Sequence, residues 1–279
     1  MNYQVTVLGS EGQIGSYLVN FLNQKGYSVN RVDIVLDQSH DLRSYSSNLH
    51  ALFEKSDFVF FLAFDVGGST YLEKFQNSFD FIDNNIRIME TTFGILNITR
   101  TPFVFASSQM SQMKFSNYGV LKLIGERWTE TMKFGKYVRF WNVYGVESDS
   151  SKYHVISDFI SMAINTGIIR MRTNGEESRN FLYAEDCAEG LHSIMENFNN
   201  IPQDAPLHLA SQDSVTILEV AKLIAREYSA SVIPSDRTDS LQMKIQNTPD
   251  PFLMNFWSPK TSLEDGVRKI GRLMQNYEQ

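Results

Sequence analysis

Short apolar runs alternate with amphipathic stretches along the first 145 residues. The apolar runs predict buried strands at residues 5–8, 28–35, 58–63, 103–106 and 137–140. The amphipathic stretches predict helices at residues 14–24, 46–54, 79–96 and 118–133. Strands that alternate with helices, several of them apolar on both faces, predict a doubly wound α/β fold, with a parallel sheet between two helix layers.

The pattern changes after residue 145. A polar stretch at 146–152 is followed by predicted helices at 155–165, 187–197 and 216–228, and residues 234–251 are polar with three prolines. We therefore expect two domains, residues 1–145 and 146–279, of which the second is a smaller α+β lobe interwoven with the first.

Composition and charge exclude several classes of protein. The chain has 279 residues and a formal net charge of −7, which argues against a partner bound mainly through its phosphates, such as a nucleic acid. The single cysteine, Cys187, can form no intrachain disulfide, and the five histidines show no metal-ligand spacing. The longest apolar run, 58–64, is too short to cross a bilayer, and the N-terminus lacks a secretory signal pattern. These features predict a soluble, cytoplasmic protein without a nucleic-acid, membrane or metal partner.

The predicted strand at residues 5–8 runs into a glycine-rich turn, G-x-x-G-x-x-G, and then into a helix. Glycines at this point allow a tight turn and let a pyrophosphate approach the helix N-terminus. A strand before the turn and a helix after it are the context in which this pattern indicates dinucleotide binding. The residues expected to contact the cofactor are Gly9, Gly12, Gln13, Ile14 and Gly15.

The second predicted strand ends near a carboxylate, Asp33, which lies 24 residues after Gly9. A carboxylate there accepts hydrogen bonds from the adenosine ribose and repels a 2′-phosphate, and no arginine directly follows it. NAD is therefore favoured over NADP.

Tyr118 and Lys122 form a Y-x-x-x-K pair at the start of a predicted helix, one turn apart and therefore on one face. A nearby ammonium lowers the pKa of a tyrosine by favouring the phenolate, which can then take a proton from a substrate hydroxyl. Such a pair is common by itself. Its combination with the glycine-rich turn, and with a strand that ends in Ser107-Ser108, makes it specific.

Six further segments match motifs of a known family. With them the chain resembles the extended short-chain dehydrogenase/reductases, the NAD-dependent sugar-nucleotide epimerase/dehydratase family, and the resemblance covers nearly the whole chain. These segments are Asp41-Leu42, Leu62-Ala63 with Val66-Gly67-Gly68 ("LAA…VGG" in the family), Asn84-Asn85, residues 139–145 ("R-[FY]-x-N-[VP]-Y-G"), residues 179–186 ("R-D-F-[IV]-[HY]-V-x-D") and residues 256–266 ("LGWxPKTSLEEGL").

The resemblance implies a role for each matching residue. Tyr118 would be the acid/base, Lys122 would lower its pKa and bind the nicotinamide ribose, and Ser108 would hydrogen-bond the substrate oxygen, with Ser107 as the competing candidate. Further cofactor contacts would come from Asp41, Leu42, Leu62 and Ala63. The substrate would be held at Gly67, and its diphosphate by Asn142 and Arg179. The nucleotide base would lie near residues 153–175 and 235–250.

The chain departs from the family at three points that bear on the reaction. Gln109-Met110 stands where dehydratases carry Asp-Glu, and neither side chain can move a proton, so a 4,6-dehydratase or a decarboxylase is disfavoured. His154 resembles the acid of the GDP-fucose synthase branch, but Met110 replaces the cysteine of that branch. His154 would protonate one carbon, hydrogen-bond the substrate, or serve only as a hydrogen-bonded histidine at the start of a helix. Tyr118 lies only 10 positions after Ser108, and this short connection leaves the identity of the sugar open.

The function that we expect is an NAD-dependent nucleotide-sugar epimerase that works through a keto-sugar intermediate. The alternatives are a nucleotide-sugar ketoreductase or dehydrogenase with exchangeable NAD(P)H, and a non-catalytic NAD-binding regulator. The helices at 77–96 and 118–133 are where the family forms a four-helix dimer interface. A homodimer is expected from the apolar residues Phe79, Phe81, Ile82, Ile86, Met89 and Phe93.

Overall fold

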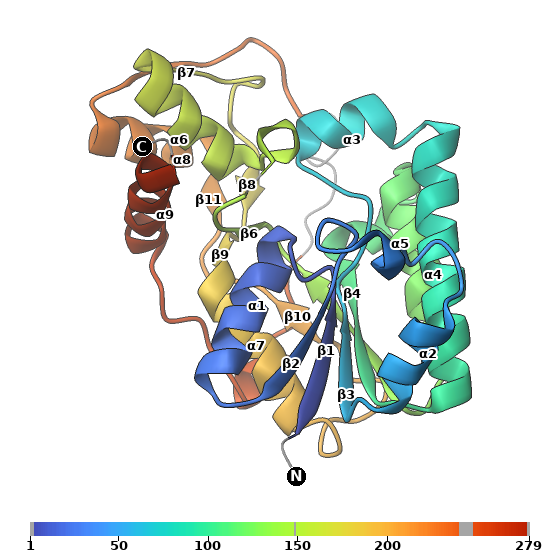
Figure 1. The fold of residues 1–279 in the computed structure, drawn as a ribbon. Coiled ribbons are helices and arrows are strands. Elements are labelled where there is room, and N and C mark those ends of the chain that lie inside the picture. Colours follow the sequence, from blue (N-terminus) through green and yellow to red (C-terminus); the bar gives the residue numbers. More distant parts are fainter. Residues whose placement is uncertain (1–2, 148, 240–247, 278–279) are drawn as a thin grey trace.

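A computed structural model of the chain describes residues 3–147, 149–239 and 248–277 (Figure 1). Its central sheet has six parallel strands in the order β10-β5-β4-β3-β1-β2. The strands are β1 (Gln4–Leu8), β2 (Ser28–Val32), β3 (Phe58–Phe61), β4 (Phe103–Ser108), β5 (Gly135–Phe140) and β10 (His208–Leu209). Every residue of β3 and β4 is buried, as expected for strands that are covered on both faces.

Two helix layers cover the sheet (Figure 1). One layer consists of α1 (Gln13–Gln24) and α7 (Ala184–Glu196), and the other of α2 (Ser47–Glu54), α4 (Phe79–Thr99) and α5 (Asn117–Glu130). Side chains of β4 alternate between the two cores: Val104 packs with α1 and α7, whereas Phe103 and Phe105 pack with α4 and α5. The predicted doubly wound α/β fold is confirmed.

A second lobe has its own apolar core. Its helices are α6 (Val155–Thr166), α8 (Ile217–Tyr228) and α9 (Leu263–Tyr277). Its short strands pair as β7 (Ile168–Arg170) with β12 (Ser231–Ile233), β8 (Ser178–Arg179) with β11 (Val215–Thr216), and β6 (Val143–Tyr144) with β9 (Leu182–Tyr183). Between these segments the chain returns to the first lobe as α7 and β10, so the two lobes share the sequence after residue 145.

The two lobes meet beside α3 (Ser69–Phe75), which Figure 1 shows facing the second lobe. The amide of Gly68 donates to the carbonyl of Lys152 at 2.9 Å, and Arg172 donates to Thr70 at 2.7 Å. A Cβ atom on Gly68 would run into the carbonyl oxygen of Tyr153. At Gly68 itself the lobes therefore touch through main chain, and side chains such as Arg172 add contacts around it.

Candidate active site

The glycine-rich turn connects β1 to α1 at the carboxyl end of the sheet. Gly9 has a φ of +80°, and a Cβ on it would lie 2.8 Å from Cα of Ala63. A Cβ on Gly15 would run into the carbonyl of Gly9. Helix α1 begins directly after Gly12, so its free N–H groups open onto this turn. The turn thus has the tight shape and exposed backbone donors that fit a dinucleotide pyrophosphate.

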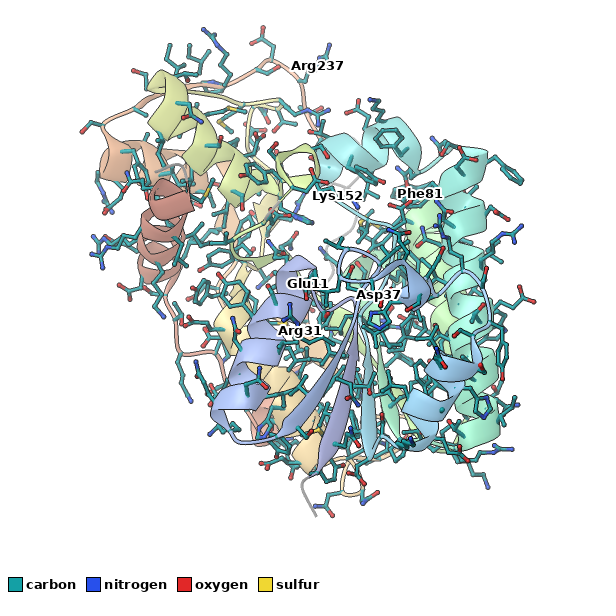
Figure 2. The ribbon with its side chains drawn as sticks, in the orientation of Figure 1. Glu11, Arg31, Asp37, Phe81, Lys152 and Arg237 are labelled. Carbon is teal, nitrogen blue, oxygen red and sulfur yellow. The ribbon has the colours of Figure 1, made fainter. Side chains whose placement is uncertain are left out.

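Asp33 follows β2 beside this turn. Its two carboxylate oxygens accept the amides of Glu11 and Val35, each at 3.0 Å. The nearby Arg31 pairs with Glu11 at 2.6 Å, and Figure 2 shows these two side chains next to each other. Carboxylate oxygens accept more than one hydrogen bond, so Asp33 can also accept from ribose hydroxyls.

The other predicted cofactor contacts lie around the same edge of the sheet. The carboxylate of Asp41 pairs with Arg43 at 2.8 Å, and this hydrogen bond holds the pKa of Asp41 below its usual value. Leu42 is buried in the core under α4. Leu62 and Ala63 follow β3 and are partly buried. Leu42 therefore has a structural role, whatever else it contacts.

Tyr118 and Lys122 lie on the first turns of α5, which Ser116 caps by accepting the amide of Gly119. The ammonium of Lys122 donates to the carbonyl of Ala106 at 2.7 Å, and its Nζ lies 5.7 Å from the centre of the Tyr118 ring. Burial raises the pKa of Tyr118 to about 12, and a hydrogen bond with Ser108 opposes this shift. Burial lowers the pKa of Lys122 to about 7, against the opposing charge of Glu126.

The two serines at the end of β4 have different partners. Ser107 donates to Glu126 at 2.5 Å, and Arg139 binds the same carboxylate with two hydrogen bonds of 2.7 and 2.8 Å. Ser108 hydrogen-bonds Tyr118 and accepts the amide of Met110. The structure therefore places Ser108, and not Ser107, against the tyrosine.

Two side chains predicted to bind a diphosphate come from either side of the lobe boundary. Asn142 follows β5 with a φ of +35°, and its buried amide nitrogen has no hydrogen-bond partner among the described residues. Arg179 on β8 pairs with Asp239 at 2.7 Å. Of the segments expected near the base, residues 240–247 lie outside the described part of the chain.

His154 lies at the lobe boundary, where it precedes α6. Its Nδ1 lies 2.7 Å from Glu147, which also accepts the amide of His154 at 2.9 Å. The contact at Nδ1 orients the ring, and Nε2 has no partner among the residues that the structure describes. The segment around Gly67 packs against Lys152, which Figure 2 labels between the two lobes.

A scan against family models matches residues 5–209 to the model described as "NAD dependent epimerase/dehydratase family". The chain belongs to the NAD-dependent epimerase/dehydratase family. The predicted family is confirmed, and with it the enzyme class and the NAD cofactor.

Proteins that are similar to this chain carry several activities in their names. UDP-glucuronic acid decarboxylase 1 of Danio rerio is 23% identical, with 95% of this chain and 71% of that protein covered. UDP-glucuronic acid 4-epimerase from Bacillus cereus, solved with UDP-glucuronic acid and NAD, has a TM-score of 0.80 at 20% identity, with 98% and 99% covered. A GDP-6-OMe-4-keto-L-xylo-heptose reductase from C. jejuni has a TM-score of 0.81 at 16% identity, with 99% and 98% covered. Solved structures with this fold thus include a sugar-nucleotide epimerase, a dehydratase and a reductase.

Among the described residues, no helix of this family member combines the length and apolarity that a membrane span requires. In the same part of the chain, no three His, Cys, Asp or Glu side chains are grouped so that they could hold a metal ion.

Two residues beside Tyr118 and Lys122 were not predicted as part of the site. Glu126 lies four positions after Lys122 on the same helix face, and this spacing could have indicated it. Phe64 packs against both Tyr118 and Lys122. The sequence could have indicated Phe64 as well, because Phe64 replaces the second alanine of the LAA segment.

Proposed function

We propose that this chain is an NAD-dependent nucleotide-sugar epimerase that works through a keto-sugar intermediate, with Tyr118 as acid and base. The observation that carries the proposal is the grouping of Ser108, Tyr118 and Lys122 at the carboxyl end of β4, the sheet edge onto which the turn at Gly9 also opens. The turn at Gly9 would hold NAD, which would supply a hydride acceptor for the sugar carbon and a hydride donor to its opposite face.

The protein's own groups move the proton. A phenol with a pKa of about 12 holds its proton at neutral pH, so a positive charge must act on Tyr118 before it can serve as a base. Lys122, whose pKa is about 7, supplies this charge when it is protonated, and its bond to Ala106 holds it beside the tyrosine. Ser108 donates toward the phenolate and can also hold the sugar oxygen in line with it.

The diphosphate would lie between the lobes. The unpartnered amide of Asn142 supports this role because a buried donor without an acceptor is costly, and a phosphate oxygen would satisfy it. The guanidinium fork of Arg179 suits an anion, which would share the fork with Asp239 or displace that carboxylate. His154, with Nε2 free, would face the sugar at the rim beside Gly67.

Decarboxylation is not part of the proposal, although curated relatives carry that name. The residues after Ser108 are Gln109 and Met110, neither of which is an acid or a base. The names of these relatives nevertheless support UDP-sugars, including UDP-glucuronic acid, as the first substrates to test.

A homodimer through α4 and α5 is the proposed assembly. Of the apolar residues expected at this interface, Phe81, Met89 and Phe93 are buried in the core, whereas Phe79 and Ile86 are 79% and 40% exposed. On or near α5, Phe115 and Ile124 are exposed as well. These four side chains support a smaller apolar interface than the sequence suggested.

The decisive experiment begins with mass spectrometry of the supernatant after denaturation of freshly purified protein. We expect stoichiometric NAD⁺, followed by conversion of a UDP-, GDP- or CDP-sugar into an isomer of equal mass. Tyr118→Phe should keep the NAD⁺ and lower turnover by about 10²–10⁴-fold, since it removes the acid/base group alone.

Other outcomes would overturn the epimerase. The purified protein could instead contain no cofactor and change the absorbance of added NAD(P)H when a keto-sugar nucleotide is present. It would then be a ketoreductase or dehydrogenase. Release of CO₂ from UDP-glucuronic acid would make it a decarboxylase. NAD⁺ that is bound without turnover of any sugar nucleotide would leave the regulator, and absence of any nicotinamide binding would refute all of these functions.

A further inference from the structure

Phe64 stands directly after Leu62-Ala63, where the LAA segment of the family has its second alanine. Its half-buried ring makes an edge contact with the ring of Tyr118, with centroids 5.9 Å apart. The centroid of the Phe64 ring also lies 3.6 Å from Nζ of Lys122. A bulky ring in place of a methyl group therefore covers both members of the proposed catalytic pair.

The ammonium of Lys122 is closed in by its neighbours. One of its N–H groups donates to Ala106 at 2.7 Å, the face of Phe64 lies 3.6 Å away, and the ring centre of Phe105 lies at 5.1 Å. Lys122 is only 3% exposed. An oxygen must come within about 2.7–3.2 Å of Nζ to accept a hydrogen bond, and the ring of Phe64 leaves no approach for one.

The backbone next to Phe64 is anchored. Asn85, fully buried on α4, accepts the amide of Asp65 at 2.7 Å and donates to the carbonyl of Asp65 at 3.1 Å. A rotation of the Phe64 side chain about χ1 therefore uncovers Lys122 with less disruption than a movement of the loop.

We propose that Phe64 gates the nicotinamide half of the cofactor site, so that a ribose reaches Lys122 only when the ring has turned away. This inference rests on the proposed role of Lys122. A desolvated contact between a cation and an aromatic face favours the covered arrangement by up to about 30-fold. The apparent affinity for a ligand falls by the fraction of molecules that are ready to bind it. Phe64 thus sets how tightly and how fast the chain takes up its cofactor.

The test is the binding of NADH to nucleotide-free protein, followed by stopped-flow fluorescence and by titration calorimetry. Phe64→Ala restores the small residue of the family and should bind NADH faster and up to about 30-fold more tightly. Phe64→Leu keeps the bulk without the aromatic face and should fall between Phe64→Ala and the wild type. A purely structural role for Phe64 would give weaker binding, not tighter.

Phe134→Ala is the matched control. Phe134 is also half-buried beneath a cation, with Cζ of Arg100 5.2 Å from its ring centre, but it precedes β5 at the far end of the sheet. This variant should bind NADH like the wild type. Circular dichroism melting of all variants establishes that they are folded.

The outcomes separate the two proposals. If the wild type binds NADH and folded Phe64→Ala binds it no faster and no more tightly, the gate is refuted while the proposed function stands. If Phe64→Ala does not fold, Phe64→Leu decides by the same criterion. If neither the wild type nor the variants bind NADH, both proposals fail.

Discussion

Ser107 and Ser108 are chemically identical neighbours, yet their surroundings give them separate tasks. Ser107 supports the Glu126–Arg139 ion pair behind the site, and Ser108 contacts Tyr118. The buried carboxylate of Glu126 is 1% exposed and depends on its donors.

Alanine substitutions should separate these tasks. Ser108→Ala should lower kcat by about 10²-fold or more, because it removes a positioned donor at the reacting oxygen, with little change in stability. Ser107→Ala should leave kcat close to the wild type but lower the free energy of unfolding by about 1–3 kcal/mol. Turnover of the sugar nucleotide and urea unfolding measure the two effects, and the opposite pattern would make Ser107 the substrate-binding serine.

The sequence alone left these two serines open, and the alternation of the strand explains only the position of Ser107. Phe103 and Phe105 face α4 and α5, so the alternation of β4 puts Ser107 on that same face, under α5. The spacing of Tyr118 and Lys122 was enough to place that pair. The pairing of Arg179 with Asp239 could not be foreseen, because it joins residues 60 positions apart.

Among the elements, α4 combines two functions along one helix. Its inner face supplies Phe81, Met89 and Phe93 to the core, and its outer face leaves Phe79 and Ile86 exposed. An exposed apolar face on a long helix is typical of an interface.

Ile86→Glu should therefore convert the proposed dimer into a monomer, since it buries a charge at the centre of the contact. Size-exclusion chromatography with light scattering gives the mass. Ile98→Glu is the control: Ile98 is 65% exposed on the same helix but lies outside the expected interface, so this variant should stay dimeric. A wild-type monomer at working concentration would refute the assembly.

Long, periodic elements were predictable and short ones were not. The helices α1, α4, α5 and α8 lie close to their predicted ranges because each carries an amphipathic pattern over several turns. Strand β10 has two residues, too few for any pattern, and only its pairing with β5 makes it part of the sheet. The strand predicted at 28–35 ends at Val32, because Asp33 starts a turn by accepting the amide of Val35.

For the whole molecule, the buried ammonium of Lys122 affects global stability. Its pKa is about 7 in the folded protein, against about 10.4 for an unfolded lysine. Between these values the unfolded chain binds a proton that the native state does not hold. Stability from this group therefore rises with pH above 7, by at most about 1.4 kcal/mol per pH unit, and is constant below pH 7.

Urea unfolding between pH 6 and 9.5 of the wild type and Lys122→Met tests this. The difference in unfolding free energy between the two proteins should shift in favour of the wild type as the pH rises above 7. Above that range Tyr118 titrates and acts in the opposite direction. If the unfolding free energies of the two proteins changed with pH in parallel, burial of the ammonium would not lower the stability of the folded protein.

The main-chain contact at Gly68 sets how closely the segment before α3 and the segment before α6 approach each other. The main-chain atoms of residues 68 and 153 stand so close that a single added methyl group has no space. Any side chain at position 68 would therefore have to push these two segments apart. Because His154 directly follows Tyr153, a residue larger than glycine at position 68 would also shift the imidazole that we propose to face the sugar.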